Sequence, residues 1–207
     1  VGQAKTLLRN EARTLAYARH TNIVRFLGAC TEPPMLLMAL APNGNVRQLL
    51  DASPDMLQSD RFHIARAVCS GMAALHSQNI LHLDLKPSNI LLSADNTPLI
   101  AGFGLSVTQG GALSVMASGA GGGTSMAGGT RGTVQYKAPE LSDDEDAEYA
   151  PPADVYSFGM VMWEVFTSEV PWARLSAIQI IRIHLKAQMK DDPNPRRPQL
   201  TDADRDW

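Results

Sequence analysis

The stretch His82-Leu83-Asp84-Leu85-Lys86-Pro87-Ser88-Asn89 decides how the rest of the sequence is interpreted. It falls in a loop between two short apolar runs, residues 80–83 and 90–93, which are typical of β-strands. Asp84 and Lys86 alternate along the chain, so their side chains point the same way if the loop is extended. Pro87 prevents the loop from continuing as a helix, and Asn89 returns toward the same region. The sequence of the loop therefore predicts that the carboxylate of Asp84, the ammonium group of Lys86 and the amide of Asn89 lie close together.

This trio of side chains suits phosphoryl transfer. A carboxylate orients an attacking hydroxyl, a lysine steadies the oxygens of the phosphate in transfer, and an amide oxygen helps to hold a divalent metal ion. We therefore take Asp84, Lys86 and Asn89 as a candidate phosphoryl-transfer site.

Apolar residues at helical spacing, and short apolar runs between turn residues, predict the elements around the loop. Residues 154–168 are apolar nearly all round and predict a buried central helix. Glu11 lies between leucines on one helical face, either as a surface residue or as an acid aimed across a cleft. The other expected helices cover residues 5–19, 61–77 and 174–190. Strands are expected at residues 23–27, 35–40, 80–83, 90–93 and 99–101, with a hairpin turn at 95–98.

Five motifs in the sequence resemble those of the eukaryotic protein kinase family, and they occur in the family's order. The similarity of residues 19–24 to the junction after helix C makes Glu11 the family's ion-pairing glutamate. The other four motifs are the catalytic loop at 82–89, the metal-binding DFG segment at 101–104, the end of the activation segment at 132–140, and the buried helix that anchors the catalytic loop at 154–159.

The resemblance implies an α+β, two-lobe protein kinase fold. Residues 1–41 would form a partial small lobe, with helix C and two strands leading to the hinge, and residues 42–207 a mainly helical large lobe that lacks its last helices. The Gly-rich phosphate cover and the strand lysine that pairs with Glu11 have no counterpart in the sequence, so we expect a domain truncated at both ends. Residues 28–30, 42–44 and 154–159 resemble the tyrosine-kinase-like group.

By the same resemblance, Asp84 would be the catalytic base, Lys86 a contact to the transferred phosphate, and Asn89 the metal ligand. Thr133 would bridge Asp84 and Lys86. Lys86 and the pair Gly132-Thr133 are similar to the serine/threonine-directed form of the loop, which implies transfer to serine or threonine hydroxyls.

ATP and Mg²⁺ are the cofactors that the resemblance implies. Met38 would face the back of the adenine pocket, Ala39 and Ala41 would offer backbone hydrogen bonds to the base, and Leu91 would pack beneath it. A stacked apolar column would align helix C with the catalytic loop, with His82 as a packed residue rather than a proton carrier. The column consists of Leu15, Phe26, His82 and Phe103.

Two residues depart from the family's pattern. Gly102 stands where the aspartate of the DFG segment holds magnesium, and glycine offers no ligand. If this loss equals that of one oxyanion donor, roughly 3 to 4 kcal/mol, the rate falls about 100-fold to 1000-fold. Leu83 replaces the catalytic-loop arginine, so no guanidinium is present there to pair with a phosphorylated activation segment.

These departures leave two interpretations open. The first is a serine/threonine protein kinase domain whose transfer rate is impaired by Gly102 and by the missing small-lobe strands. The second is a pseudokinase, in which the same fold is kept as a binding or allosteric signalling module. The partner would be a protein substrate in the first case and a signalling protein in the second.

Composition excludes several other classes. The chain has 207 residues with 18 basic and 21 acidic side chains, and its net charge of -3 argues against nucleic acid as a partner. No apolar run is long enough for membrane insertion. Cys30 and Cys69 lack partners at ligand spacing, so we expect two reduced core thiols and a cytoplasmic protein. Residues 108–130 are rich in Gly, Ala and Ser and predict a flexible insertion in the activation segment.

Overall fold

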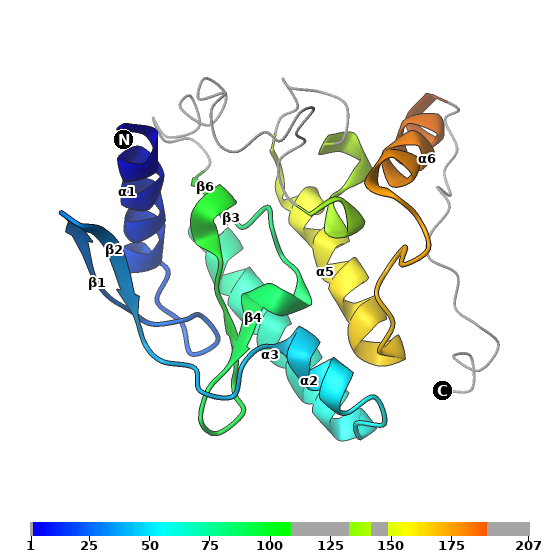
Figure 1. The fold of residues 1–207 in the computed structure, drawn as a ribbon, viewed down its shortest axis with the longest axis horizontal. Coiled ribbons are helices and arrows are strands. Elements are labelled where there is room, and N and C mark those ends of the chain that lie inside the picture. The colour runs from blue at the N-terminus through cyan, green and yellow to red at the C-terminus, as the bar shows by residue number, and fades with distance from the viewer. Residues whose placement is uncertain (1, 109–132, 142–148, 190–207) are drawn as a thin grey trace.

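The computed structural model describes residues 2–108, 133–141 and 149–189. Helix α1 (Gly2–Tyr17) leads into an antiparallel hairpin of β1 (Phe26–Thr31) and β2 (Pro34–Met38). The remaining helices are α2 (Val46–Ala52), α3 (Gln58–Ser77), α5 (Pro151–Thr167) and α6 (Ala177–Met189). Figure 1 shows α1 beside the hairpin at one side of the molecule, α5 and α6 at the other side, and α3 in the middle, behind the short strands.

Short strand pairs lie between the two sides (Figure 1). Strand β3 (Ile80–Leu81) pairs antiparallel with β6 (Val107–Thr108), and β4 (Ile90–Leu92) pairs with β5 (Pro98–Ile100). The loop that contains Asp84 connects β3 to β4, and a 3-10 turn at Phe103–Leu105 follows β5. The loop that contains Asp84 and the turn at Phe103–Leu105 are thus each joined to both strand pairs.

The core joins α3 and α5 to these strands. Leu75, Ile90, Ile100 and Val161 are fully buried members of one apolar cluster. Gly71 allows α3 to approach the strands closely, because a Cβ at this position would lie 2.7 Å from the Ile100 Cδ1 atom.

The expected helices and the hairpin turn at 95–98 are confirmed, with ends that shift by a few residues. Residues 23–27 do not form the first hairpin strand, which begins at Phe26. Ile23 and Val24 are buried instead, and Ile23 forms an isolated bridge with Ile100. The sequence analysis also missed α2, although Asn45 and Gln48 form a capping box at its start.

The prediction that both cysteines lie in the core is wrong. Cys30 and Cys69 are both free, but Cys30 is only half-buried and Cys69 is exposed, because it faces away from the packed side of α3. The predicted insertion at 108–130 lies outside the described residues except for Thr108, and the division of the chain at residue 41 stays a prediction. Among the described helices, none is long and apolar enough to cross a membrane.

Candidate active site

The loop between β3 and β4 is held from below by a buried aspartate of α5. Asp154 accepts hydrogen bonds from the backbone N–H groups of His82 and Leu83, each at 2.8 Å, and lies 2.9 Å from the His76 Nε2 atom. Burial would raise the pKa of Asp154, but these hydrogen bonds outweigh burial and hold that pKa below its ordinary value. Asp154 therefore fixes the start of the loop as a carboxylate.

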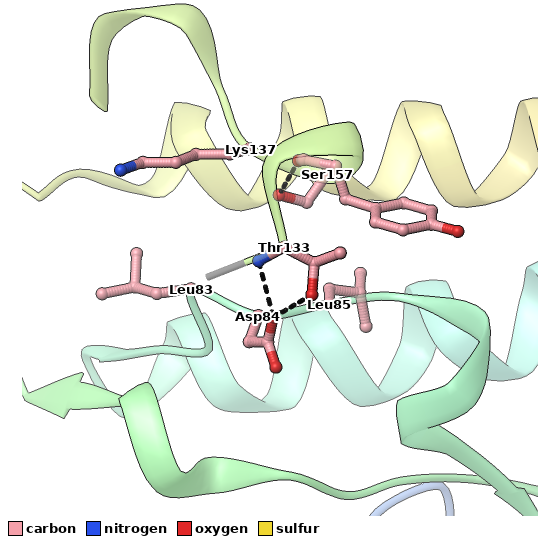
Figure 2. Close-up of a pocket in the computed structure, with 7 residues that line it drawn as sticks. Leu83, Asp84, Leu85, Thr133, Lys137 and Ser157 are labelled. Carbon is pink, nitrogen blue, oxygen red and sulfur yellow. Dashed lines mark hydrogen bonds between the residues drawn. The ribbon is translucent and has the colours of Figure 1, made fainter. Parts of the chain in front are cut away.

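The three side chains of the predicted bridge are in contact. Lys86 Nζ lies 2.9 Å from Asp84 Oδ2 and donates to Thr133 Oγ1 at 2.7 Å. Thr133 donates to Asp84 Oδ1 through its hydroxyl at 3.2 Å and through its backbone N–H at 3.3 Å. Figure 2 shows Thr133 facing Asp84 across a small pocket that Leu83, Leu85 and Lys137 also line. The arrangement places a carboxylate and an ammonium group side by side at a surface.

Asn89 joins the same network from the other side. Its Nδ2 atom donates to the backbone oxygen of Asp84 at 2.7 Å and to Asp84 Oδ2 at 3.0 Å. Asn89 also fills the space beside Gly102, since a Cβ at Gly102 would lie 2.6 Å from the Asn89 Cγ atom. Gly102 has a φ of 82°, which favours glycine. The positive φ of Gly102 and the position of the Asn89 side chain thus both disfavour an aspartate at residue 102.

These residues do not fit a magnesium ion held between two protein ligands. Magnesium takes near-octahedral oxygen ligands, usually including carboxylates. Asn89 offers one amide oxygen and Gly102 offers none, while both oxygens of Asp84 accept hydrogen bonds within the network. No group of three or more acidic, histidine or cysteine side chains suited to a metal occurs among the described residues.

The residues predicted to contact adenine lie at the end of β2 (Met38), directly after it (Ala39 and Ala41) and in β4 (Leu91). Met38 is 38% exposed, so it does not close the back of a pocket in this structure. The Ala39 N–H donates to the Arg25 carbonyl at 2.8 Å, which leaves the Ala39 carbonyl as the group that could accept from a base. Ala41 and Leu91 are half-buried. An acceptor at residue 39 and an N–H at residue 41 are the kinds of group that pair with the hydrogen-bonding edge of adenine, and binding of the base at these residues stays a prediction.

Glu11 lies on the part of α1 that faces the turn after Gly102. Its Oε2 atom is 3.9 Å from where a Cβ of Gly104 would stand. Burial raises the pKa of Glu11, and no residue in the described ranges forms an ion pair with it. Glu11, on α1, and the Asp84 network, in the loop between β3 and β4, therefore have no described contact with each other.

His82 is packed, as expected. It is fully buried, its Nε2 atom lies 2.9 Å from the Ala101 carbonyl oxygen, and its ring centroid is 5.1 Å from that of Phe103. Burial lowers the pKa of His82, which keeps the ring neutral. Leu15 is buried in the same apolar core cluster as Phe103, and the half-buried Phe26 packs against this cluster.

Leu83 has a structural role that the sequence analysis did not assign. It packs against a small apolar cluster of Ala138, Leu141 and Ala153. Apolar contact thus connects the catalytic loop to the segment after Thr133 at the position where the family's arginine would stand.

Three charged or polar residues near the site were also missed. The half-buried Arg47 and the buried Tyr136 both hydrogen-bond to the fully buried Glu164. The available signal was Glu164 itself, because a charged residue inside an otherwise apolar helix must be paired when it is buried.

The fold and the Asp84 loop are those of a domain of the protein kinase class, and comparisons with known proteins agree. The family model described as protein tyrosine and serine/threonine kinase matches residues 2–203. The serine/threonine-protein kinase STY46 of Arabidopsis thaliana is 30% identical over 88% of this chain and 30% of its own length. The mitogen-activated protein kinase kinase kinase dlk-1 of Caenorhabditis briggsae is 33% identical over 87% of this chain and 20% of its own length.

The serine/threonine-protein kinase CTR1 of Arabidopsis thaliana is 33% identical over 92% of this chain and 22% of its own length. The chain thus spans less than a third of each of these three relatives. The chain belongs to the protein tyrosine and serine/threonine kinase family, and it is similar to the tyrosine-kinase-like group.

Proposed function

We propose that the chain is a serine/threonine protein kinase domain that transfers the terminal phosphate of ATP to protein hydroxyls, at a rate reduced by Gly102. The observation that carries the proposal is the network of Asp84, Lys86 and Thr133, which has the geometry needed to orient a hydroxyl beside a phosphate. Two free cysteines support a reducing compartment, and we take the cytoplasm as the proposed location.

Each residue of the network has a defined task in this proposal. Asp84 accepts the proton of the substrate hydroxyl while the hydroxyl oxygen forms its bond to the terminal phosphorus and the bond to the bridging oxygen of ATP breaks, leaving ADP. Lys86 stabilises the charge on the transferred oxygens. Thr133 keeps Asp84 and Lys86 together, and it marks the side from which a serine or threonine would enter.

ATP would be held by its base and by apolar packing. The Ala39 carbonyl and the Ala41 N–H would bind the adenine edge, and Leu91 would pack beneath the ring. Met38 would have to turn inward from its exposed position to lie behind the ring. Glu11 would lie on the phosphate side, next to the Gly102–Gly104 turn.

A radiolabelled ATP assay with a generic protein substrate tests the proposal. We expect slow but measurable transfer that falls at least about 100-fold in Asp84→Asn, because the general base is lost. Asp95→Asn is the matched control, since Asp95 lies in the exposed β4–β5 turn and should keep the wild-type rate. Transfer that is equal in the wild type and Asp84→Asn would refute the catalytic proposal.

A second candidate, a pseudokinase that binds a signalling protein, is favoured by one observation. Asn89 fills the space beside Gly102, so the site has lost both the carboxylate and the room for it. In the same assay, a wild type without activity and a Gly102→Asp variant with activity would support this candidate. Because Asn89 must move to admit the new side chain, we expect any gain in Gly102→Asp to be partial.

A further inference from the structure

Helix α6 packs against residues 133–141 through a face that carries a histidine. Residues four apart lie on the same face of a helix, and Ile180 and His184 are both buried. The helix contacts the two 3-10 turns at Val134–Tyr136 and Pro139–Leu141, which Figure 1 shows beside it in yellow-green. A titratable ring, only 2% exposed, therefore lies on the packed face of α6.

Aromatic rings and a cation lie around His184. The ring centroid of Tyr156, on α5, is 6.3 Å from that of His184, and the ring centroid of Trp172, in the loop before α6, is 6.4 Å from it, both in edge-to-face arrangements. Lys137, directly after the first 3-10 turn, adds a positive charge that acts on the ring. Burial, and to a smaller extent Lys137, lowers the pKa of His184 to about 4, so the ring is neutral at neutral pH.

The other charged and titratable groups described on these elements are bound elsewhere or exposed. On α5, Asp154 accepts from the catalytic loop, and Glu164 accepts from Arg47 and from the Tyr136 hydroxyl. The exposed groups on the second turn, on the loop before α6 and on α6 itself are Glu140, Glu169, Arg174, Arg182 and Lys186. Protonation of His184 in the packed state would therefore place a second positive charge beside Lys137 and away from water, which is costly.

We propose that His184 makes the packing of α6 sensitive to pH. A neutral ring keeps α6 against residues 133–141, and protonation in mildly acidic solution favours a state in which α6 has moved off this segment and the ring reaches water. Thr133 belongs to the segment, so the release of α6 also loosens that side of the Asp84 network. The inference goes beyond the proposed function and does not depend on turnover of ATP.

The size of the effect follows from the two states of the ring. A histidine whose pKa is lower in the packed state binds its proton more weakly there, so acid shifts the equilibrium toward the released state. With a pKa of about 4 when α6 is packed and the ordinary value of 6.5 when the ring is in water, the opening equilibrium of α6 should increase about 20-fold between pH 7 and pH 5. The contribution of His184 to the packing is thus complete above pH 6.5 and is lost progressively below it.

Hydrogen exchange of the whole chain at pH 7 and pH 5, corrected for the intrinsic pH dependence of exchange and measured by mass spectrometry, tests the proposal. In the wild type we expect the protection of the α6 amides to fall about 20-fold, whereas His184→Leu, which cannot be protonated at this position, should keep its protection. His63→Leu is the matched control, because His63 is exposed on α3 and this variant should show the wild-type fall. An equal fall in the wild type and His184→Leu, or no fall in the wild type, would overturn the proposal.

An NMR titration of the wild type covers the case in which His184→Leu fails to fold. We expect the ring of His184 to titrate with a midpoint below 6.5, and the amide resonances of residues 133–141 to shift with the same midpoint. A midpoint at or above 6.5, or amides of this segment that do not follow the ring, would contradict the proposal. Because neither measurement uses turnover, a chain without transfer activity would refute the proposed function and leave this test unchanged.

Discussion

The catalytic loop and the corner around Glu11 differ in how their charges are matched. Asp84 contacts Lys86, Asn89 and Thr133, Lys86 also donates to Thr133, and Asp154 holds the start of the loop from the core. Glu11 is half-buried with a raised pKa and has no ion-pair partner among the residues that the structure describes. Contacts of the loop's own residues and of Asp154 therefore hold the loop, and removing one of them should destabilise the protein. The surroundings of Glu11 leave its charge unmatched, and removing that charge should have a small, pH-dependent effect on stability.

Removing Asp154, which holds the catalytic loop, should give the largest loss of stability. Asp154→Ala leaves two backbone N–H groups without their acceptor, so we expect a loss of about 3 to 5 kcal/mol in the free energy of unfolding, measured in urea. Asp51→Ala, at a side chain that is 67% exposed, should lose less than about 1 kcal/mol. Similar losses in the two variants would show that the loop is not held by Asp154.

The same carboxylate predicts a pH dependence. The folded-state pKa of Asp154 is held below its ordinary value of 3.8. The ionised side chain therefore contributes its full share to the free energy of unfolding at neutral pH, and this share is lost as pH falls below 3.8. The acid unfolding of wild type should therefore have a component that Asp154→Ala lacks.

Gly102 lies where the two regions meet and should give an intermediate effect. Gly102→Ala adds a Cβ at positive φ, 2.6 Å from Asn89 Cγ, and we expect a loss of about 1 to 3 kcal/mol in the free energy of unfolding. Gly104→Ala is the matched control, since its Cβ meets only Glu11 Oε2 at 3.9 Å. Thermal unfolding compares the two, and equal melting temperatures would mean that Asn89 yields freely.

The sequence predicted the loop chemistry well because the spacing of Asp84, Lys86 and Asn89 is local. Strand alternation and one proline place them together, and the bridge to Thr133 followed from the kinase resemblance. Their catalytic roles stay predictions. Helix α3 was also found from its period, since it buries one regular set of residues, whereas α5 was found because its sequence is apolar nearly all round.

What the sequence could not predict depends on contacts between distant segments. Glu164 meets Arg47 across 117 residues, and no local pattern shows which cation a buried acid will find. The closeness of Asn89 to Gly102 depends on how β4 and β5 pair. Helix α2 is a different case, because its capping signal, Asn45 followed by Gln48, is local and present in the sequence.

The smallest expected effect concerns Glu11, the carboxylate without an ion-pair partner among the described residues. Glu11→Gln removes a charge whose folded-state pKa is raised by burial, so at neutral pH the variant should melt slightly higher, by about 2 °C or less, since Glu11 is partly solvent-screened. The wild type gains stability as pH falls through that raised pKa, so the difference should shrink toward acid pH. Glu169→Gln, at an exposed position, is the control. A Glu11→Gln variant that melts lower at neutral pH would reveal a stabilising cation at this corner, and the contrast with the catalytic loop would then disappear.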